Sequence, residues 1–141
     1  MQPLGEVEFA NGVAAMFASG GYRDWKRALT RLATLPNTRM KLGGGGMTVL
    51  GHGFAAGERP PTSEALAVTW RPYFEACVEL FGANRCMFES NFPVDKGSFS
   101  YAVLWNAFKR LASEASADER DAFFSKVAAA TYRMAIPGDM K

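Results

Sequence analysis

The sequence contains few of the residues from which metal centres and disulfide frameworks are built. Its 141 residues include one histidine and two cysteines. A metal site that needs several imidazoles therefore cannot be assembled from this chain alone. Cys77 and Cys86 form neither a CxxC pair nor another zinc-like spacing, so we predict that both are buried, reduced thiols of a cytoplasmic protein.

Long apolar runs and blocks of like charge are also missing. The net charge is +2, and the basic residues are mixed with acidic ones, which argues against a nucleic-acid partner. No apolar run approaches the roughly 20 residues that a membrane span needs, so no membrane partner is expected. The chain begins MQPLGEVEFANGVAAMF, which is acidic and lacks a long apolar region, so a signal peptide is not expected either.

What the sequence does contain is an alternation of amphipathic helices with short apolar strands. Residues 1–20 show no sustained period and are interpreted as a loop or a poorly defined segment. The second helix is expected to kink or restart at Pro72 and to stop at Gly82. A capping box, Ser116 with Glu119, begins the last helix. The predicted helices are 22–35, Thr62 or Ser63 to 81, Ser98 or Ser100 to 111, and 116–132, and the predicted strands are 38–43 and 85–90.

This order of elements predicts parallel strands joined by right-handed crossovers. Only two strands are convincing, and parallel sheets are normally covered on both faces and extended by neighbouring strands. We therefore expect the chain to be the end of a larger fold with more strands. The loop between the first strand and the second helix, residues 43–63, holds seven glycines and two prolines. No GK[ST] follows the glycine run, so a phosphate-binding P-loop is not expected.

Three stretches of the sequence resemble the C-terminal part of the amidohydrolase-related metal-dependent hydrolases. These are TIM-barrel proteins that include lactonases of the pyrone-dicarboxylate type and related decarboxylases. The stretches are RMKLGGGGM, WRPYFEACVELFGANRCMFESNFPVDKGSFSYAVLWNAFKRLA and AAATYRM. The resemblance covers roughly residues 20–134. It implies an α/β fold, the C-terminal portion of a (β/α)8 barrel, in which two parallel strands with flanking helices are strands seven and eight. Residues 1–141 would form a single region, a partial barrel that is family-like over 21–134.

The resemblance also implies where the chemistry lies. Active sites of these barrels lie at the C-terminal ends of the strands, here residues 43–47 and 90–95. The family commonly ends its eighth strand with G-[ST]-D-W-P, whose Asp serves as general base or helps to hold a metal. This chain has ESNFP, with Asn91 at the Asp position. An amide can bind substrate but cannot accept a proton at neutral pH.

The histidines that bind metal in the family, an HxH on the first strand and others on later strands, are absent from this chain. A zinc-like divalent metal is thus an expectation for the complete barrel only, and this chain alone is not expected to bind one. Because side chains alternate along a strand, Met87, Glu89 and Asn91 should share one face, as should Lys41 and Gly43. We predict a cross-strand ion pair between Lys41 and Glu89, in which Glu89 is either a substitute acid or base or a structural partner.

Three further positions have both a plain and a functional interpretation. Asp95 and Lys96 are either a solvated turn or substrate contacts, with Lys96 attracting a carboxylate. His52, in the glycine-rich loop, is either a surface residue or a group that contacts substrate or shuttles protons. Trp70 and Trp105 are predicted to belong to the core. The candidate catalytic residues are thus Asn91 and Glu89, and the candidate substrate-binding residues are Lys41, His52, Asp95 and Lys96.

Two functions remain open. In the first, the chain is the C-terminal part of a hydrolase that acts on a small molecule, a lactone, an amide or a related carbonyl, or performs a related decarboxylation, through an activated water. The 141-residue chain by itself is then expected to be inactive. In the second, it is a truncated, non-catalytic module that pairs its exposed strands with itself or with a partner.

Overall fold

Two short parallel strands form the centre of the protein. The computed structural model describes residues 21–47 and 52–136. β1 (Met40–Leu42) pairs with β2 (Cys86–Phe88), with Met40 opposite Cys86 and Leu42 opposite Phe88. The parallel pairing predicted from the order of elements is confirmed. Both strands are shorter than predicted, because the glycine run follows β1 and a turn at 90–91 follows β2.

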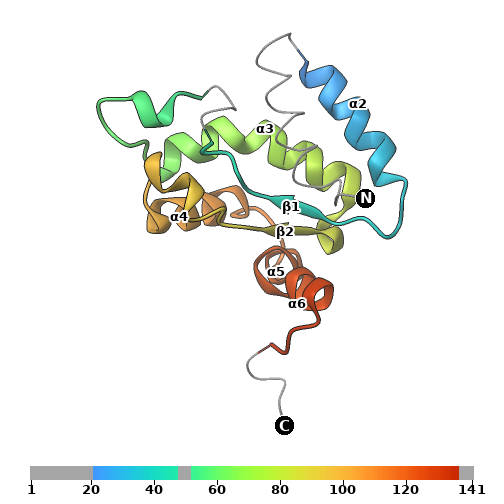
Figure 1. Cartoon of the computed structure of the whole chain (residues 1–141). Coiled ribbons are helices and arrows are strands. Elements are labelled where there is room, and N and C mark those ends of the chain that lie inside the picture. Colours follow the sequence, from blue (N-terminus) through green and yellow to red (C-terminus); the bar gives the residue numbers. More distant parts are fainter. Residues whose placement is uncertain (1–20, 48–51, 137–141) are drawn as a thin grey trace.

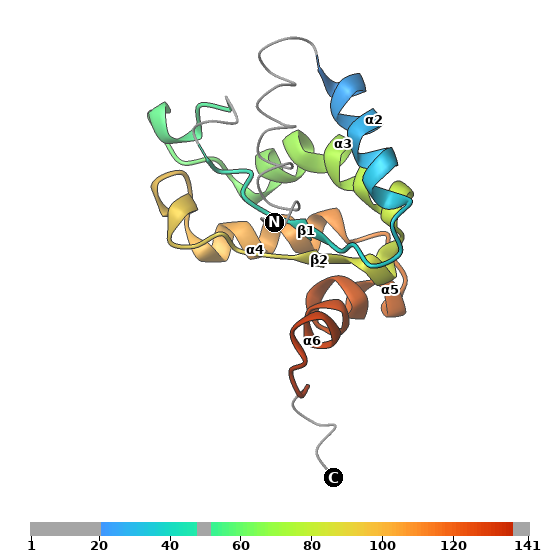
Figure 2. The same cartoon turned by 45° about the vertical axis from the view of Figure 1, so that its right-hand side comes forward.

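Helices cover one face of this sheet, and further helical segments lie beside β2 (Figures 1 and 2). α3 and α4 pack on the face that carries Met40, Leu42, Cys86 and Phe88. The last helical segments lie beside β2, where Met87 packs against Ala122 and Val127. None of the described helices is long and apolar enough to cross a bilayer. The helices are α2 (Tyr22–Ala33), α3 (Ser63–Phe81), α4 (Tyr101–Leu111), α5 (Ala117–Asp121), the π-helical η5 (Ala122–Lys126) and α6 (Val127–Tyr132), and the 3₁₀ turns are η2 (Phe54–Ala56), η3 (Ala83–Arg85) and η4 (Val94–Gly97).

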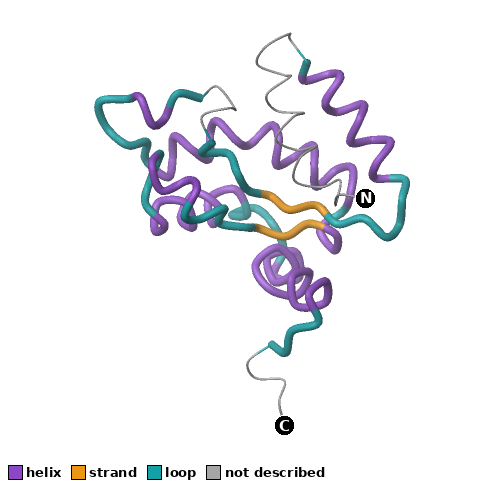
Figure 3. The backbone as a smooth tube through the Cα atoms, in the orientation of Figure 1, coloured by secondary structure: helices purple, strands orange, loops and turns teal. Residues whose placement is uncertain are grey.

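The helix starts follow from side-chain caps that the sequence shows directly. The hydroxyl oxygens of Thr62, Ser100 and Ser116 each accept a hydrogen bond from a backbone N–H three residues later, at the starts of α3, α4 and α5. At Ser116 the Glu119 side chain completes the predicted capping box. α3 ends at Gly82, whose φ of 78° suits a residue without a Cβ. Figure 3 shows how these helices alternate with the two strands.

The expected restart of the helix at Pro72 is wrong, since α3 continues as one helix from Ser63 to Phe81, while the alternative expectation of a kink there stays a prediction. A proline removes one backbone hydrogen bond and leaves the carbonyl four residues earlier without its usual donor. That residue is Val68, which is 72% exposed, so water can satisfy its carbonyl. Residues on both sides of Pro72, among them Trp70 and Cys77, pack into the same core.

Aromatic rings make up much of the core between the sheet and the helices. Phe88 of β2 stacks on Phe108 of α4, with ring centroids 4.3 Å apart, and on Phe74 of α3 at 5.8 Å. Trp70 is 8% exposed and belongs to this core, and Trp105 packs against it, as predicted. The ends of β1 and β2 are therefore held against a rigid layer of side chains.

Both cysteines are fully buried free thiols, as the sequence predicts. Burial raises the pKa of Cys86 to about 12 and raises that of Cys77 further. The reactive thiolate is therefore scarce at neutral pH. We expect Ellman's reagent to label neither thiol in the native chain and both in denaturant. Rapid labelling of the native chain, at a rate like that of the denatured chain, would contradict this burial.

Candidate active site at the ends of the strands

An ion pair joins the C-terminal ends of the two strands. Nζ of Lys41 lies 2.6 Å from a carboxylate oxygen of Glu89, and the two side chains are 30% and 18% exposed. Lys41 lies opposite Met87 and next to Leu42, so alternation directs it away from the aromatic core. A Cβ on Gly43 would collide with Glu89, so the glycine leaves the space that this carboxylate occupies. The predicted ion pair is confirmed, while the catalytic role of Glu89 stays a prediction.

The chain turns sharply at Asn91, a short distance after β2 ends at Phe88. Its φ of 51° lies in the left-handed region, which asparagine enters more readily than most residues. The common face predicted for Met87, Glu89 and Asn91 stays a prediction at Asn91, which lies beyond the end of β2. Nδ2 of Asn91 donates a hydrogen bond of 2.9 Å to Oδ1 of Asp95. The Ser90 hydroxyl accepts a bond from the N–H of Phe92 and stabilises the same turn.

Asp95 is not the solvated turn residue that the sequence suggests. It is 1% exposed, whereas its neighbour Lys96 is exposed. Its second carboxylate oxygen, Oδ2, accepts a hydrogen bond from the N–H of Gly46, 3.2 Å away. Burial raises the pKa of Asp95, and the bonds from Asn91 and Gly46 oppose that shift. The carboxylate thus belongs to the protein's own network, and direct contact of Asp95 or Lys96 with substrate stays a prediction.

The glycine run after β1 is explained by close packing. A Cβ on Gly45 would lie 2.6 Å from the indole of Trp70. A Cβ on Gly46 would lie 2.5 Å from the ring of Phe99 and 2.8 Å from Cγ of Asp95. The hydroxyl of Ser98, a buried residue that sequence reasoning missed, donates a 2.6 Å bond to the Gly46 carbonyl. Consecutive glycines at the end of a strand are the signal that indicates such a close approach.

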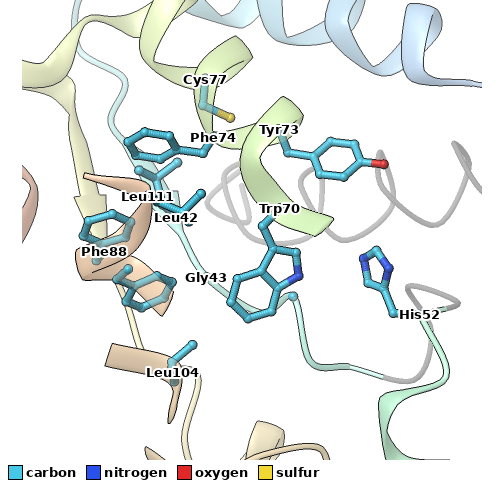
Figure 4. Close-up of a pocket in the computed structure, with 12 residues that line it drawn as sticks. Leu42, Gly43, His52, Trp70, Tyr73, Phe74, Cys77, Phe88, Leu104 and Leu111 are labelled. Carbon is cyan, nitrogen blue, oxygen red and sulfur yellow. The ribbon is translucent and has the colours of Figure 1, made fainter. Parts of the chain in front are cut away.

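His52 occupies a different place from the ion pair. It lines a cavity of about 50 Å³ between β1, α3 and α4, and none of the residues Lys41, Glu89 and Asn91 lines it (Figure 4). The imidazole stacks on Phe54, with ring centroids 5.1 Å apart. Burial lowers the pKa of His52, which favours the neutral ring near pH 7. The surface interpretation of His52 is therefore only partly correct, and its contact with substrate stays a prediction.

The described residues do not fit a metal centre by themselves. No three of their His, Cys, Asp and Glu side chains lie close enough together to hold an ion. Glu89 is paired with Lys41, and both oxygens of Asp95 accept hydrogen bonds from within the protein. No catalytic step is therefore assigned to a metal bound by these residues.

Known proteins share both the sequence pattern and the fold. The sequence model of the amidohydrolase family matches residues 8–134. An uncharacterized protein of Sinorhizobium fredii, y4mH, is 41% identical over 113 residues, which are 80% of this chain and 34% of that protein. The chain thus spans about a third of the length of this curated relative.

Two crystal structures of an amidohydrolase from Burkholderia multivorans share the fold. The one with bound HEPES has a TM-score of 0.74 at 28% identity and is matched over 91% of this chain and 43% of its own. The one with bound zinc has a TM-score of 0.72 at 30% identity, over 88% and 41%. The match of the family's sequence model to most of the chain decides the assignment: this chain belongs to the amidohydrolase family.

Proposed function

We propose that the chain forms the C-terminal part of an amidohydrolase barrel, with β1 and β2 as its last two strands. The match to about two fifths of the Burkholderia multivorans amidohydrolase supports this assignment. So does the parallel pairing of two strands through the crossover helix α3. In such a barrel, the ends of β1 and β2 would form part of the active-site rim.

The reaction we propose is hydrolysis of a lactone, an amide or a related carbonyl, or a related decarboxylation, through an activated water. The observation that carries this proposal is the Lys41–Glu89 ion pair at the C-terminal ends of the strands. Glu89 lies 2.6 Å from the ammonium group of Lys41, at the edge where the substrate of such a barrel would lie. The Glu89 carboxylate would take a proton from water as the water attacks the carbonyl carbon.

Three other residues would assist at this rim. Asn91 would form hydrogen bonds with water or substrate without taking a proton. Lys96, which is exposed on η4, would attract a carboxylate of the substrate. Lys41 would keep Glu89 in place through the 2.6 Å contact. His52, which lines a separate cavity, has no assigned step in this reaction.

A fusion protein tests the proposal. This chain is joined in frame to the part of the Burkholderia multivorans amidohydrolase that it does not match, and the product is assayed on a panel of lactones and amides. We expect turnover by the fusion protein and none by the 141-residue chain alone. A cooperative thermal transition serves as the control for folding. A folded fusion protein without turnover on any substrate would contradict the proposal.

The alternative is a non-catalytic module that pairs with itself or with a partner. It is favoured by the small sheet, which has two strands in the described part of the chain. Sedimentation and binding of a hydrophobic dye separate the alternatives. Association with dye binding supports the module, whereas a monomer that melts cooperatively argues against it.

A further inference from the structure

We infer that Asp95 is a positioning residue for Asn91. Its buried carboxylate holds the Asn91 amide so that the oxygen Oδ1, and not the nitrogen, is presented to a ligand. The rim position of Asn91 is thereby a hydrogen-bond acceptor that takes a donor group, such as a water, a hydroxyl or an amide N–H. The place of this ligand at the rim of a barrel rests on the proposed function, whereas the orientation of the amide does not.

The orientation follows from the chemistry of the contact between the two side chains. Both carboxylate oxygens of Asp95 act as acceptors, Oδ2 from the N–H of Gly46 and Oδ1 from the NH₂ of Asn91 at 2.9 Å, so the amide nitrogen faces Asp95. Turning the amide over would set two acceptor oxygens against each other. None of the described residues donates a hydrogen bond to Oδ1 of Asn91. This oxygen is also not among the buried atoms without a partner, so solvent can reach it. This oxygen is therefore left for a ligand.

Asp95 is itself held on several sides, so it cannot turn to suit the amide. Its Oδ2 accepts from Gly46, and its own N–H donates to the carbonyl of Asn91, 3.2 Å away. Gly46 has no space for a Cβ, and Ser98 bonds the carbonyl of Gly46. We call Gly46, Asn91, Asp95 and Ser98 the latch. The latch joins the segment after β1 to the segment after β2 and fixes the geometry of both.

The latch predicts the effects of two substitutions. In Asp95→Asn, the new amide oxygen can still accept from Gly46, and its NH₂ then faces Asn91. The Asn91 amide is expected to turn over, which replaces the acceptor at the rim with a donor. In the double exchange Asn91→Asp with Asp95→Asn, the new amide at 95 donates to the new carboxylate at 91. Every hydrogen bond of the latch is then kept, and an acceptor again faces the ligand.

Side-chain amide NMR on the full 141-residue chain tests the inference without any enzyme assay. The NH₂ protons of Asn91 are expected to exchange with water about tenfold or more slowly in the native protein than in Asp95→Asn, because the bond to a carboxylate protects them. Asn106, exposed on α4, is the internal control and should not change. The double substitution should move this protection to the amide at 95. It should also restore the melting temperature that Asp95→Asn lowers, because the bond between residues 91 and 95 is again made to a carboxylate and is stronger than one between two amides.

Two results would overturn the inference. One is an Asn91 amide that exchanges as fast as that of Asn106 in the native chain. The other is a double exchange that is no more stable than Asp95→Asn alone, since a merely structural carboxylate would not be rescued by exchanging the two residues. Neither result depends on turnover. Inactivity of the fusion protein would instead count against the proposed function and leave the orientation of Asn91 untouched.

Discussion

Glu89→Gln in the fusion protein is expected to lower kcat by about 10²–10⁴-fold, the usual contribution of a positioned acid or base. Gln has nearly the shape of Glu, so it keeps the packing against Gly43 but cannot take a proton from water. KM should change much less than kcat, because proton transfer occurs in the transition state and not in substrate binding. Steady-state kinetics on the best substrate of the panel give both values.

The same exchange also disturbs an ion pair, so a stability control is needed. The Lys41 and Glu89 side chains are 30% and 18% exposed, between the surface and the buried limits, and we expect a loss of about 1–3 kcal/mol in the free energy of unfolding. Glu79→Gln is the matched control, because Glu79 pairs with Lys26 at 2.8 Å but is 66% exposed. It should leave kcat unchanged. If kcat is also unchanged in Glu89→Gln, the ion pair has a structural role only.

Gly46→Ala is expected to reduce the free energy of unfolding by about 1–3 kcal/mol, the usual cost of overpacking a tight site. The added methyl group would lie 2.5 Å from Phe99 and 2.8 Å from Asp95, both of which are buried. The segment after β1 would have to shift, which would stretch the Gly46 bonds to Asp95 and Ser98. Urea denaturation of the 141-residue chain measures the change.

Gly97→Ala is the matched control for this exchange. Gly97 lies at the end of η4, close to Asp95 in the chain, and no atom beyond its own stretch of chain lies within 4 Å of the position a Cβ would take. A change within about 0.5 kcal/mol is expected there. Equal effects of the two exchanges would show that the loss at Gly46 reflects the general flexibility of glycine and not the latch.

The sequence by itself determined the features that depend on near neighbours in the chain. Thr62, Ser100 and Ser116 begin helices because each side chain bonds a backbone N–H three residues later. Periodic apolar residues predicted α3, α4 and the two strands. The ion pair between Lys41 and Glu89 could also be predicted from the sequence, because strand alternation and parallel pairing place both side chains on one face of the sheet.

The tertiary structure alone decided the features that depend on contacts between distant segments. From the sequence, Asp95 could be a solvated turn residue. In the structure it is buried, because Gly46, 49 positions earlier, lies against it. The same contact explains why residue 46 must be a glycine, and it orients Asn91. Pro72 remains inside one helix, residues on both sides of it pack into the same core, and water can reach Val68. Local propensity carries no information about such contacts, since they form only when two loops meet in the folded chain.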